Sequence, residues 1–223
     1  MRRILRDNGL SIVMFSLFLF SVVGQSIVGY HEYNDDRKEH SQASLGYVEY
    51  LGSGHFVEAI FENWESEFLQ MGAYVLLTAF LYQKGSPESK KLDEREAVDR
   101  DASKSGRKKK KDAPWPVRRG GLILKIYENS LSLTLFLLFL ISFALHGAGG
   151  ARLYSQEQMM HGSPSVSTLQ YMGTSRFWFE SLQNWQSEFL SVFTLVILSI
   201  FLRQKGSPES KPVDSPHSQT GSD

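Results

Sequence analysis

The chain has 223 residues, with 24 lysines and arginines, 24 aspartates and glutamates, and no cysteine. A net charge of zero gives no indication of nucleic-acid binding, and the lack of cysteine excludes disulfides, thiolate metal sites and cysteine nucleophiles. Charged and apolar residues are separated along the chain, since residues 8–30 and 129–151 contain no Asp, Glu, Lys or Arg. Each run is long enough for a helix that crosses a bilayer core, which needs about 20 residues.

The sequence contains two similar copies of one segment. Residues 8–90 and 129–211 align without a gap at an offset of 121, with 33 identical residues in 83 pairs. The best-matched stretches are NWESEFL against NWQSEFL and two occurrences of QKGSPESK. A repeat of this kind sets the architecture. Each copy holds two apolar stretches, so we expect an all-α polytopic membrane protein with four transmembrane helices in two hairpins.

The first copy, residues 1–90, contains predicted spans at about 9–30 and 64–83. A short surface helix is expected over 44–51, and Ser53 is placed to cap the long helix that follows. The uncharged part of the second span is short, so its helix must begin earlier than the span itself. Apolar residues at helical spacing upstream of it agree with this expectation.

Residues 91–118 mix charged with small residues and are predicted to form a disordered, basic, cytoplasmic linker. The second copy, residues 119–211, has predicted spans at about 130–151 and 185–203. A short surface helix is expected over 167–172, where Ser167 and Gln170 match a capping box, and Thr174 is placed to cap the next helix. We expect Gly85 and Gly206 to end the second and fourth helices. Residues 212–223 are predicted to be a disordered tail.

Basic residues predict the orientation of the chain. The amino terminus, the middle loop and the tail carry 20 of the 24 lysines and arginines, and the two outer loops carry four. The positive-inside rule therefore places both termini and the linker in the cytoplasm. A two-span unit returns to the side where it began, so we expect parallel repeats related by an axis along the membrane normal, with the short amphipathic helices on the exoplasmic side.

The linker contains a basic cluster, which consists of Arg107, Lys108, Lys109, Lys110 and Lys111. One interpretation is contact with anionic lipid headgroups, because basic clusters next to a membrane attract them. The other is a topology signal in a solvated linker. We favour the second interpretation, because the positive-inside rule already explains the cluster.

Polar residues form one stripe on each of the second and fourth spans. The candidate polar seam or ion-binding site consists of Asn63, Glu67 and Gln70 in the first copy, Asn184 and Glu188 in the second, and Gln25 and His146 on the other two spans. Polar groups are costly in lipid, so these residues are expected to face protein or water. Either they pin the packing of the helices or the glutamates bind protons or cations. We favour packing, because both glutamates lie near the membrane edge.

No cofactor or metal site is predicted. His40 and His161 match between the copies but lie in polar loops, whereas His31 and His55 correspond to Arg152 and Arg176. No tight spacing of histidine and carboxylate such as H-E-x-x-H appears, and the sequence has no phosphate loop, dinucleotide fingerprint or nucleophile elbow. We therefore do not expect an enzyme.

Four stretches of the chain resemble an uncharacterised bacterial membrane-protein family that is classed as a domain of unknown function. They are RDNGLS at 6–11, YLGSGHF at 50–56, ENWESEFLQ at 62–70 and RQKGSPESK at 203–211. The resemblance covers nearly the whole chain outside the linker. It implies a bacterial inner-membrane setting and brings no activity, ligand or catalytic residue with it.

The leading hypothesis is a small structural or partner-binding protein of the bacterial cytoplasmic membrane. Its expected contacts are the lipid bilayer, possible anionic lipids, and an unknown membrane protein or a second copy of itself. The alternative is a conductor of protons, cations or small solutes that uses the glutamate stripes. A conductor needs polar groups through the whole membrane, yet the inner halves of the second and fourth spans offer only Thr78 and Ser199.

Overall fold

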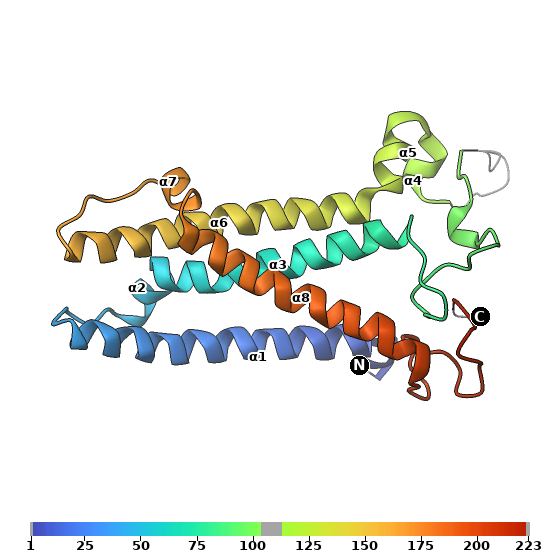
Figure 1. Ribbon diagram of the computed structural model, residues 1–223, viewed down its shortest axis with the longest axis horizontal. Helices are drawn as coiled ribbons and strands as arrows, with labels where there is room; N and C mark the ends of the chain where they lie inside the picture. Colours follow the sequence, from blue (N-terminus) through green and yellow to red (C-terminus); the bar gives the residue numbers. More distant parts are fainter. Residues whose placement is uncertain (1, 104–112, 222–223) are drawn as a thin grey trace. The chain divides into compact units, whose positions relative to one another are not determined.

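A computed structural model describes residues 2–103 and 113–221, and within these ranges every regular element is a helix. The elements, labelled in Figure 1, are α1 (Arg2–Glu39), α2 (Tyr47–Leu51), α3 (Gly54–Thr78), the 3-10 helix η1 (Ala97–Asp99), α4 (Trp115–Arg119), α5 (Gly121–Glu128), α6 (Ser130–Met160), α7 (Thr168–Met172) and α8 (Ser175–Phe201). The predicted all-α class is confirmed, and the basic cluster at 107–111 lies outside the described residues.

Among the residues that the structure describes, three helices are long and apolar enough to cross a membrane: Ile4–Glu39 within α1, all of α6, and all of α8. The shorter helix α3 has 25 residues and carries four glutamates between positions 58 and 67. These glutamates leave α3 with a shorter apolar stretch than the other three helices.

The two short helices lie within their predicted ranges, although α2 begins at Tyr47 and not at Ser44, and the predicted caps are present. The Ser167 hydroxyl accepts a hydrogen bond from Gln170 N, and the Gln170 carboxamide accepts one from Ser167 N, which completes the capping box of α7. Ser53 Oγ accepts from Phe56 N at 3.2 Å, and Thr174 Oγ1 accepts from Phe177 N at 3.3 Å. These local contacts satisfy amide groups that the first turns of α3 and α8 leave unpaired.

The expected ends of α3 and α8 are wrong. These helices stop at Thr78 and Phe201, several residues before Gly85 and Gly206. After Thr78 the α-helical hydrogen-bond pattern gives way to a tighter turn, in which the amides of the next two residues bond to carbonyls three residues earlier. Both glycines have a positive φ, 88° and 84°, but they form a separate turn beyond the helix.

The chain packs as two compact units. Unit 1 comprises residues 1–61 and 144–177, and unit 2 comprises 62–143 and 178–223. Helices α3, α6 and α8 contribute residues to both units.

Unit 1 contains two buried tyrosines at equivalent positions of the copies. Tyr50 on α2 and Tyr171 on α7 are 1% and 0% exposed. Each packs on a glycine: a Cβ atom on Gly29 would lie 2.3 Å from Tyr50 Oη, and a Cβ on Gly150 would lie 2.3 Å from Tyr171 Cε1. Gly29 and Gly150 are themselves equivalent at the offset of 121. The same glycine–tyrosine contact therefore holds a short helix against a long one in both copies.

Unit 2 contains the two GSPESK turns, which make matching hydrogen bonds. Ser89 Oγ accepts from Gln83 N at 2.8 Å, and Ser210 Oγ accepts from Gln204 N at 2.9 Å. Lys211, the last residue of the second turn, packs on the first turn and is 1% exposed. Its ammonium group donates to Gly85 O at 2.6 Å and to carbonyl groups of the tail.

Candidate functional site

The residues of the predicted polar seam differ in burial. In unit 1, His146 is fully buried whereas Gln25 is exposed. In unit 2, Gln70 is buried, Asn184 and Glu188 are half-buried, and Asn63 and Glu67 are exposed. The Asn184 side-chain amide donates to Glu180 O at 3.2 Å, one turn earlier on its own helix.

Glu58 is a buried carboxylate of unit 1 that the sequence pattern does not single out. Glu58 lies on α3 and is 6% exposed. The Tyr171 hydroxyl donates a hydrogen bond of 2.9 Å to Glu58 Oε1. One potential ligand atom of Glu58 and one of His146, on α6, lie within 4.8 Å of one another. The His146 ring also packs on Phe177, with ring centroids 4.8 Å apart.

Glycines bring α3 and α6 close together at this point. A Cβ atom on Gly149 would lie 2.6 Å from Glu58 N, and one on Gly150 would lie 2.6 Å from Glu58 Oε1. Any larger residue would collide with α3 or with the carboxylate, so the fold needs small residues here. The run of glycine and alanine at 147–151 is the sequence signal for this close approach, but it does not identify the residue that it faces.

Two corners of unit 1, at the starts of α3 and α8, place a basic side chain against a tyrosine of a long helix. In the first copy, the His55 ring stacks on Tyr33, with centroids 4.8 Å apart and an interplanar angle of 24°. His55 Nε2 lies 3.5 Å from Glu32 Oε2, and Nδ1 lies 3.4 Å from Tyr50 Oη. Burial lowers the pKa of His55, and the negative charges of Glu32 and Asp36 act against this shift.

In the second copy, Arg176 takes the place of His55 and Tyr154 takes the place of Tyr33. The Arg176 guanidinium lies 5.6 Å from the centroid of the Tyr154 ring. It forms a bidentate ion pair with Glu157, in which Nη2 lies 3.2 Å from Oε1 and Nη1 contacts Oε2. The second corner therefore carries a permanent positive charge where the first carries a titratable one.

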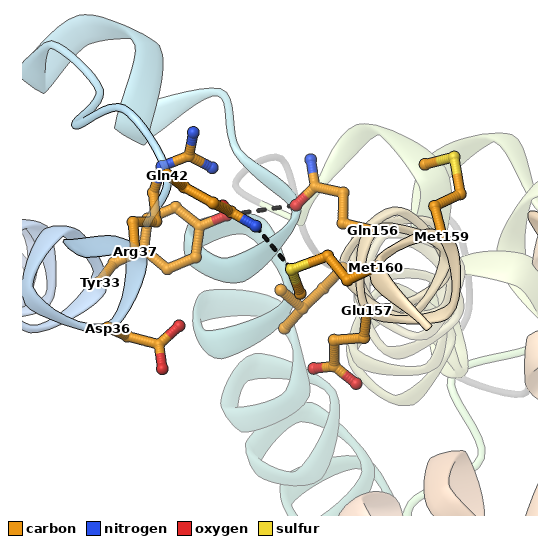
Figure 2. A pocket seen from close by; sticks show the side chains of 9 residues that line it. Tyr33, Asp36, Arg37, Gln42, Gln156, Glu157, Met159 and Met160 are labelled. Atoms are coloured by element: carbon orange, nitrogen blue, oxygen red, sulfur yellow. Dashed lines mark hydrogen bonds between the residues drawn. The ribbon is translucent and has the colours of Figure 1, made fainter. Parts of the chain in front are cut away.

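A cavity of about 240 Å³ lies between the ends of α1 and α6 in unit 1 (Figure 2). Figure 2 shows the Tyr33 hydroxyl directed at Gln156 and the Gln42 amide directed at Met160, and the Tyr33–Gln156 hydrogen bond measures 3.2 Å. Arg37 stacks over the same tyrosine, 5.8 Å from its ring centroid. Tyr33 therefore forms part of the cavity wall and also contacts His55.

Unit 2 holds a second buried carboxylate. Glu65 is 0% exposed and accepts a hydrogen bond of 3.2 Å from the Trp185 indole. The Trp185 ring also packs edge-on against Phe139 and Trp178, at centroid distances of 6.2 and 6.3 Å. The indole thus supplies the carboxylate with a donor and is itself held by neighbouring aromatic rings.

The two GSPESK turns bring Glu88 and Glu209 together. The Tyr74 hydroxyl donates to Glu88 Oε2 at 3.3 Å. Burial, together with the hydrogen bond and the negative charge of Glu209, raises the pKa of Glu88 to about 7, while the hydrogen bond from Tyr74 acts in the opposite direction. The sequence places these glutamates at equivalent positions but gives no indication that they meet.

Over the residues that the structure describes, the fold is all-helical, and three of its helices are long and apolar enough to cross a membrane. The chain belongs to the family described as Domain of unknown function (DUF6766), whose model matches residues 1–222. The predicted membership of an uncharacterised family is therefore confirmed. No curated protein and no solved structure matches the chain.

Proposed function

We propose that this protein is a structural or partner-binding component of the bacterial cytoplasmic membrane, with four transmembrane helices in two parallel hairpins and both termini in the cytoplasm. The partner is a second copy of the chain or another membrane protein. The distribution of basic residues and the local contacts that recur at the offset of 121 support the topology.

The main support for the proposal is the hydrogen bonding of the polar side chains in the inner half of the membrane. Residues 75–81 and 196–202 contain two polar side chains, Thr78 and Ser199. Thr78 Oγ1 donates to Val75 O at 3.1 Å, and Ser199 Oγ donates to Val196 O at 3.0 Å. Each hydroxyl thus bonds to its own helix, which favours a packing role over a polar pathway.

The buried carboxylates support the same proposal. Glu58 accepts a hydrogen bond from Tyr171, and Glu65 accepts one from Trp185. Both donors are aromatic side chains, Tyr171 fully buried and Trp185 half-buried, which the surrounding packing holds in place. A carboxylate that is bonded in this way specifies how helices pack, and removal of the donor costs the free energy of that buried hydrogen bond.

Flux measurements in proteoliposomes test the function directly. Purified wild-type protein is compared with the Glu67→Gln/Glu188→Gln double variant and with empty liposomes, for protons and for alkali cations. We expect the flux through both proteins to equal that of empty liposomes. A flux that is present with the wild type and absent with the double variant would contradict this proposal and support the alternative, a conductor of protons or cations.

A photo-crosslinking experiment in native membranes tests partner binding. A crosslinking amino acid replaces Phe20, which is 78% exposed on α1, and in a matched control it replaces the buried Tyr50. We expect a discrete adduct of defined mass from position 20 and none from position 50. Replacement of the outer loops should abolish the adduct, whereas the Glu67→Gln/Glu188→Gln variant should retain it. No adduct from position 20 in any membrane preparation would count against a partner on this helix.

The topology is tested by cysteine labelling, because the chain has no cysteine of its own. Single variants Ser44→Cys and Ser165→Cys probe equivalent positions of the two outer loops, and Ser103→Cys and Ser218→Cys probe the linker and the tail. A membrane-impermeant thiol reagent should label the first two in intact cells and the last two only after permeabilisation. Labelling of Ser103→Cys in intact cells would exclude the four-span topology.

A further inference from the structure

Two metal-ligating side chains from distant parts of the sequence meet in the interior of unit 1. Glu58 and His146 are 6% and 0% exposed, and they stand on different helices, α3 and α6. A potential ligand atom of each lies within 4.8 Å of the other. Two ligands of one transition-metal ion, each about 2.1 Å from it, lie up to about 4.2 Å apart. Small side-chain rotations therefore bring both groups within reach of a common ion.

We propose that Glu58 and His146 are two ligands of a divalent transition-metal ion, of the class of Zn²⁺ and Mn²⁺, which links α3 to α6 inside unit 1. Imidazole nitrogen and carboxylate oxygen are the ligand atoms that such ions accept in proteins. An ion held by two protein groups keeps further positions for water or for additional side chains. This role goes beyond the membrane-structural function proposed above.

Electrostatics favours an ion at this position. A buried carboxylate costs free energy unless a cation or several hydrogen bonds compensate its charge. The Tyr171 hydroxyl donates to Glu58 Oε1 and stabilises the carboxylate through its dipole. A divalent cation would add a charge opposite to that of the carboxylate, and it would bind the neutral form of the imidazole.

The surroundings hold both ligands in fixed positions. The Tyr171 hydroxyl orients the Glu58 carboxylate through a hydrogen bond of 2.9 Å to Oε1. Phe177 packs on the His146 ring, and Gly149 and Gly150 set the approach of the two helices. Tyr171 is therefore a positioning residue for the proposed site, and binding of the ion should stabilise the folded chain.

The test uses the full chain, purified with a tag that contains no histidine. Metal content per chain is measured by plasma mass spectrometry, and thermal unfolding is then followed after EDTA treatment and after addition of Zn²⁺, Mn²⁺ or Co²⁺. We expect about one ion per chain and an unfolding temperature that rises by several degrees when the metal is restored. The Glu58→Gln and His146→Gln variants should lose both the ion and the rise.

Two further variants separate metal binding from packing. Glu67→Gln removes an exposed acid from the same helix and should keep the ion. Tyr171→Phe keeps both ligands and should weaken metal affinity by about 10- to 100-fold, which is measurable even where a ligand variant fails to fold. The proposal would be overturned if none of the three ions changed the unfolding temperature of the metal-free wild type. An ion that persists in both ligand variants would overturn it as well.

Discussion

The two corners of unit 1 have the same scaffold but carry different basic groups. In each corner a hydroxyl caps the long helix, a tyrosine of another long helix supports the basic side chain, and an acid pairs with it. The first corner uses His55 with Glu32, and the second uses Arg176 with Glu157. A duplicated sequence can thus keep one packing arrangement and still assign a pH response to a single copy.

The direction of that response follows from the pKa of His55. Burial lowers the pKa in the folded state, so the folded chain releases this proton more readily than the unfolded chain. The contribution of His55 to folding is therefore intact above the ordinary histidine pKa of about 6.5, and it is lost as the pH falls through the lowered value. Arg176 remains charged throughout this range.

The largest expected effect comes from removing the buried tyrosine of either copy. Tyr50→Ala and Tyr171→Ala each delete a fully buried ring, and such deletions cost about 3–5 kcal/mol. Chemical denaturation of the purified chain measures the loss. Conservative variants distinguish the copies: Tyr171→Phe should cost more than Tyr50→Phe, because Tyr171 bonds to a buried carboxylate. Equal costs for the two phenylalanine variants would contradict this difference.

The glycines beneath these rings give the next largest effect. Gly150→Ala would place a methyl group against both Tyr171 and Glu58, and overpacking of this kind costs about 1–3 kcal/mol. Gly29→Ala should cost less, because its methyl group meets only the end of Tyr50. Gly24→Ala is the control, since a Cβ atom there has no neighbour within 4 Å. The order of unfolding midpoints checks the prediction, and a Gly24→Ala variant as unstable as Gly150→Ala would refute it.

A smaller effect is expected from exchanging the two basic residues. His55→Arg should remove the loss of stability on acidification, because arginine does not titrate in this range. Arg176→His should add a second pH-dependent corner. The pH-dependent difference in the free energy of unfolding between variant and wild type should be about 1 kcal/mol or less, because these contacts are partly exposed. Thermal unfolding across the pH range measures it, and wild-type dependence retained in His55→Arg would show that another group titrates.

The smallest effect concerns Glu88 and Glu209, which also stand at equivalent positions. Because the folded pKa of Glu88 is raised from 4.5 to about 7, the folded state holds this proton more tightly than the unfolded state. Its contribution to stability is present at acidic pH and is lost as the pH rises through about 7. Glu88→Gln should therefore stabilise the chain slightly above neutral pH and leave it unchanged in acid. The measurement is the unfolding midpoint of the wild type and of Glu88→Gln, in acid and above neutral pH. An equal gain in stability at both pH values would argue against a proton shared by Glu88 and Glu209.

Local features were predictable from the sequence, and contacts between distant segments were not. The capping box of Ser167 and Gln170 depends on residues three apart, and the long helices follow from their apolar runs. The sequence did not identify Glu58 as a candidate site residue, because it precedes the predicted second span and its equivalent in the second copy is Phe179. Its burial depends on glycines more than 90 residues away on α6.

The expectation about Gly85 and Gly206 failed for a related reason. A glycine followed by proline is a common signal for the end of a helix, but α3 and α8 stop earlier and use these residues for a turn. Serine hydroxyls stabilise that turn and, in the first copy, so does Lys211 at the end of the second turn. The tail sequence is rich in proline and serine, and nothing in it identifies the turn that it contacts.

Hydrogen–deuterium exchange at two pH values compares the two corners within one molecule and tests the central claim most directly. Peptides that cover 30–39 and 47–57 report on the first corner, and those that cover 151–160 and 168–177 report on the second. After correction for intrinsic exchange rates, exchange at about pH 7.5 is compared with exchange at about pH 5.5, a change that starts above the ordinary histidine pKa of about 6.5 and moves toward the lowered pKa of His55. We expect the first pair of peptides to lose protection while the second pair keeps it. Equal loss in both pairs, or loss confined to the second, would contradict it.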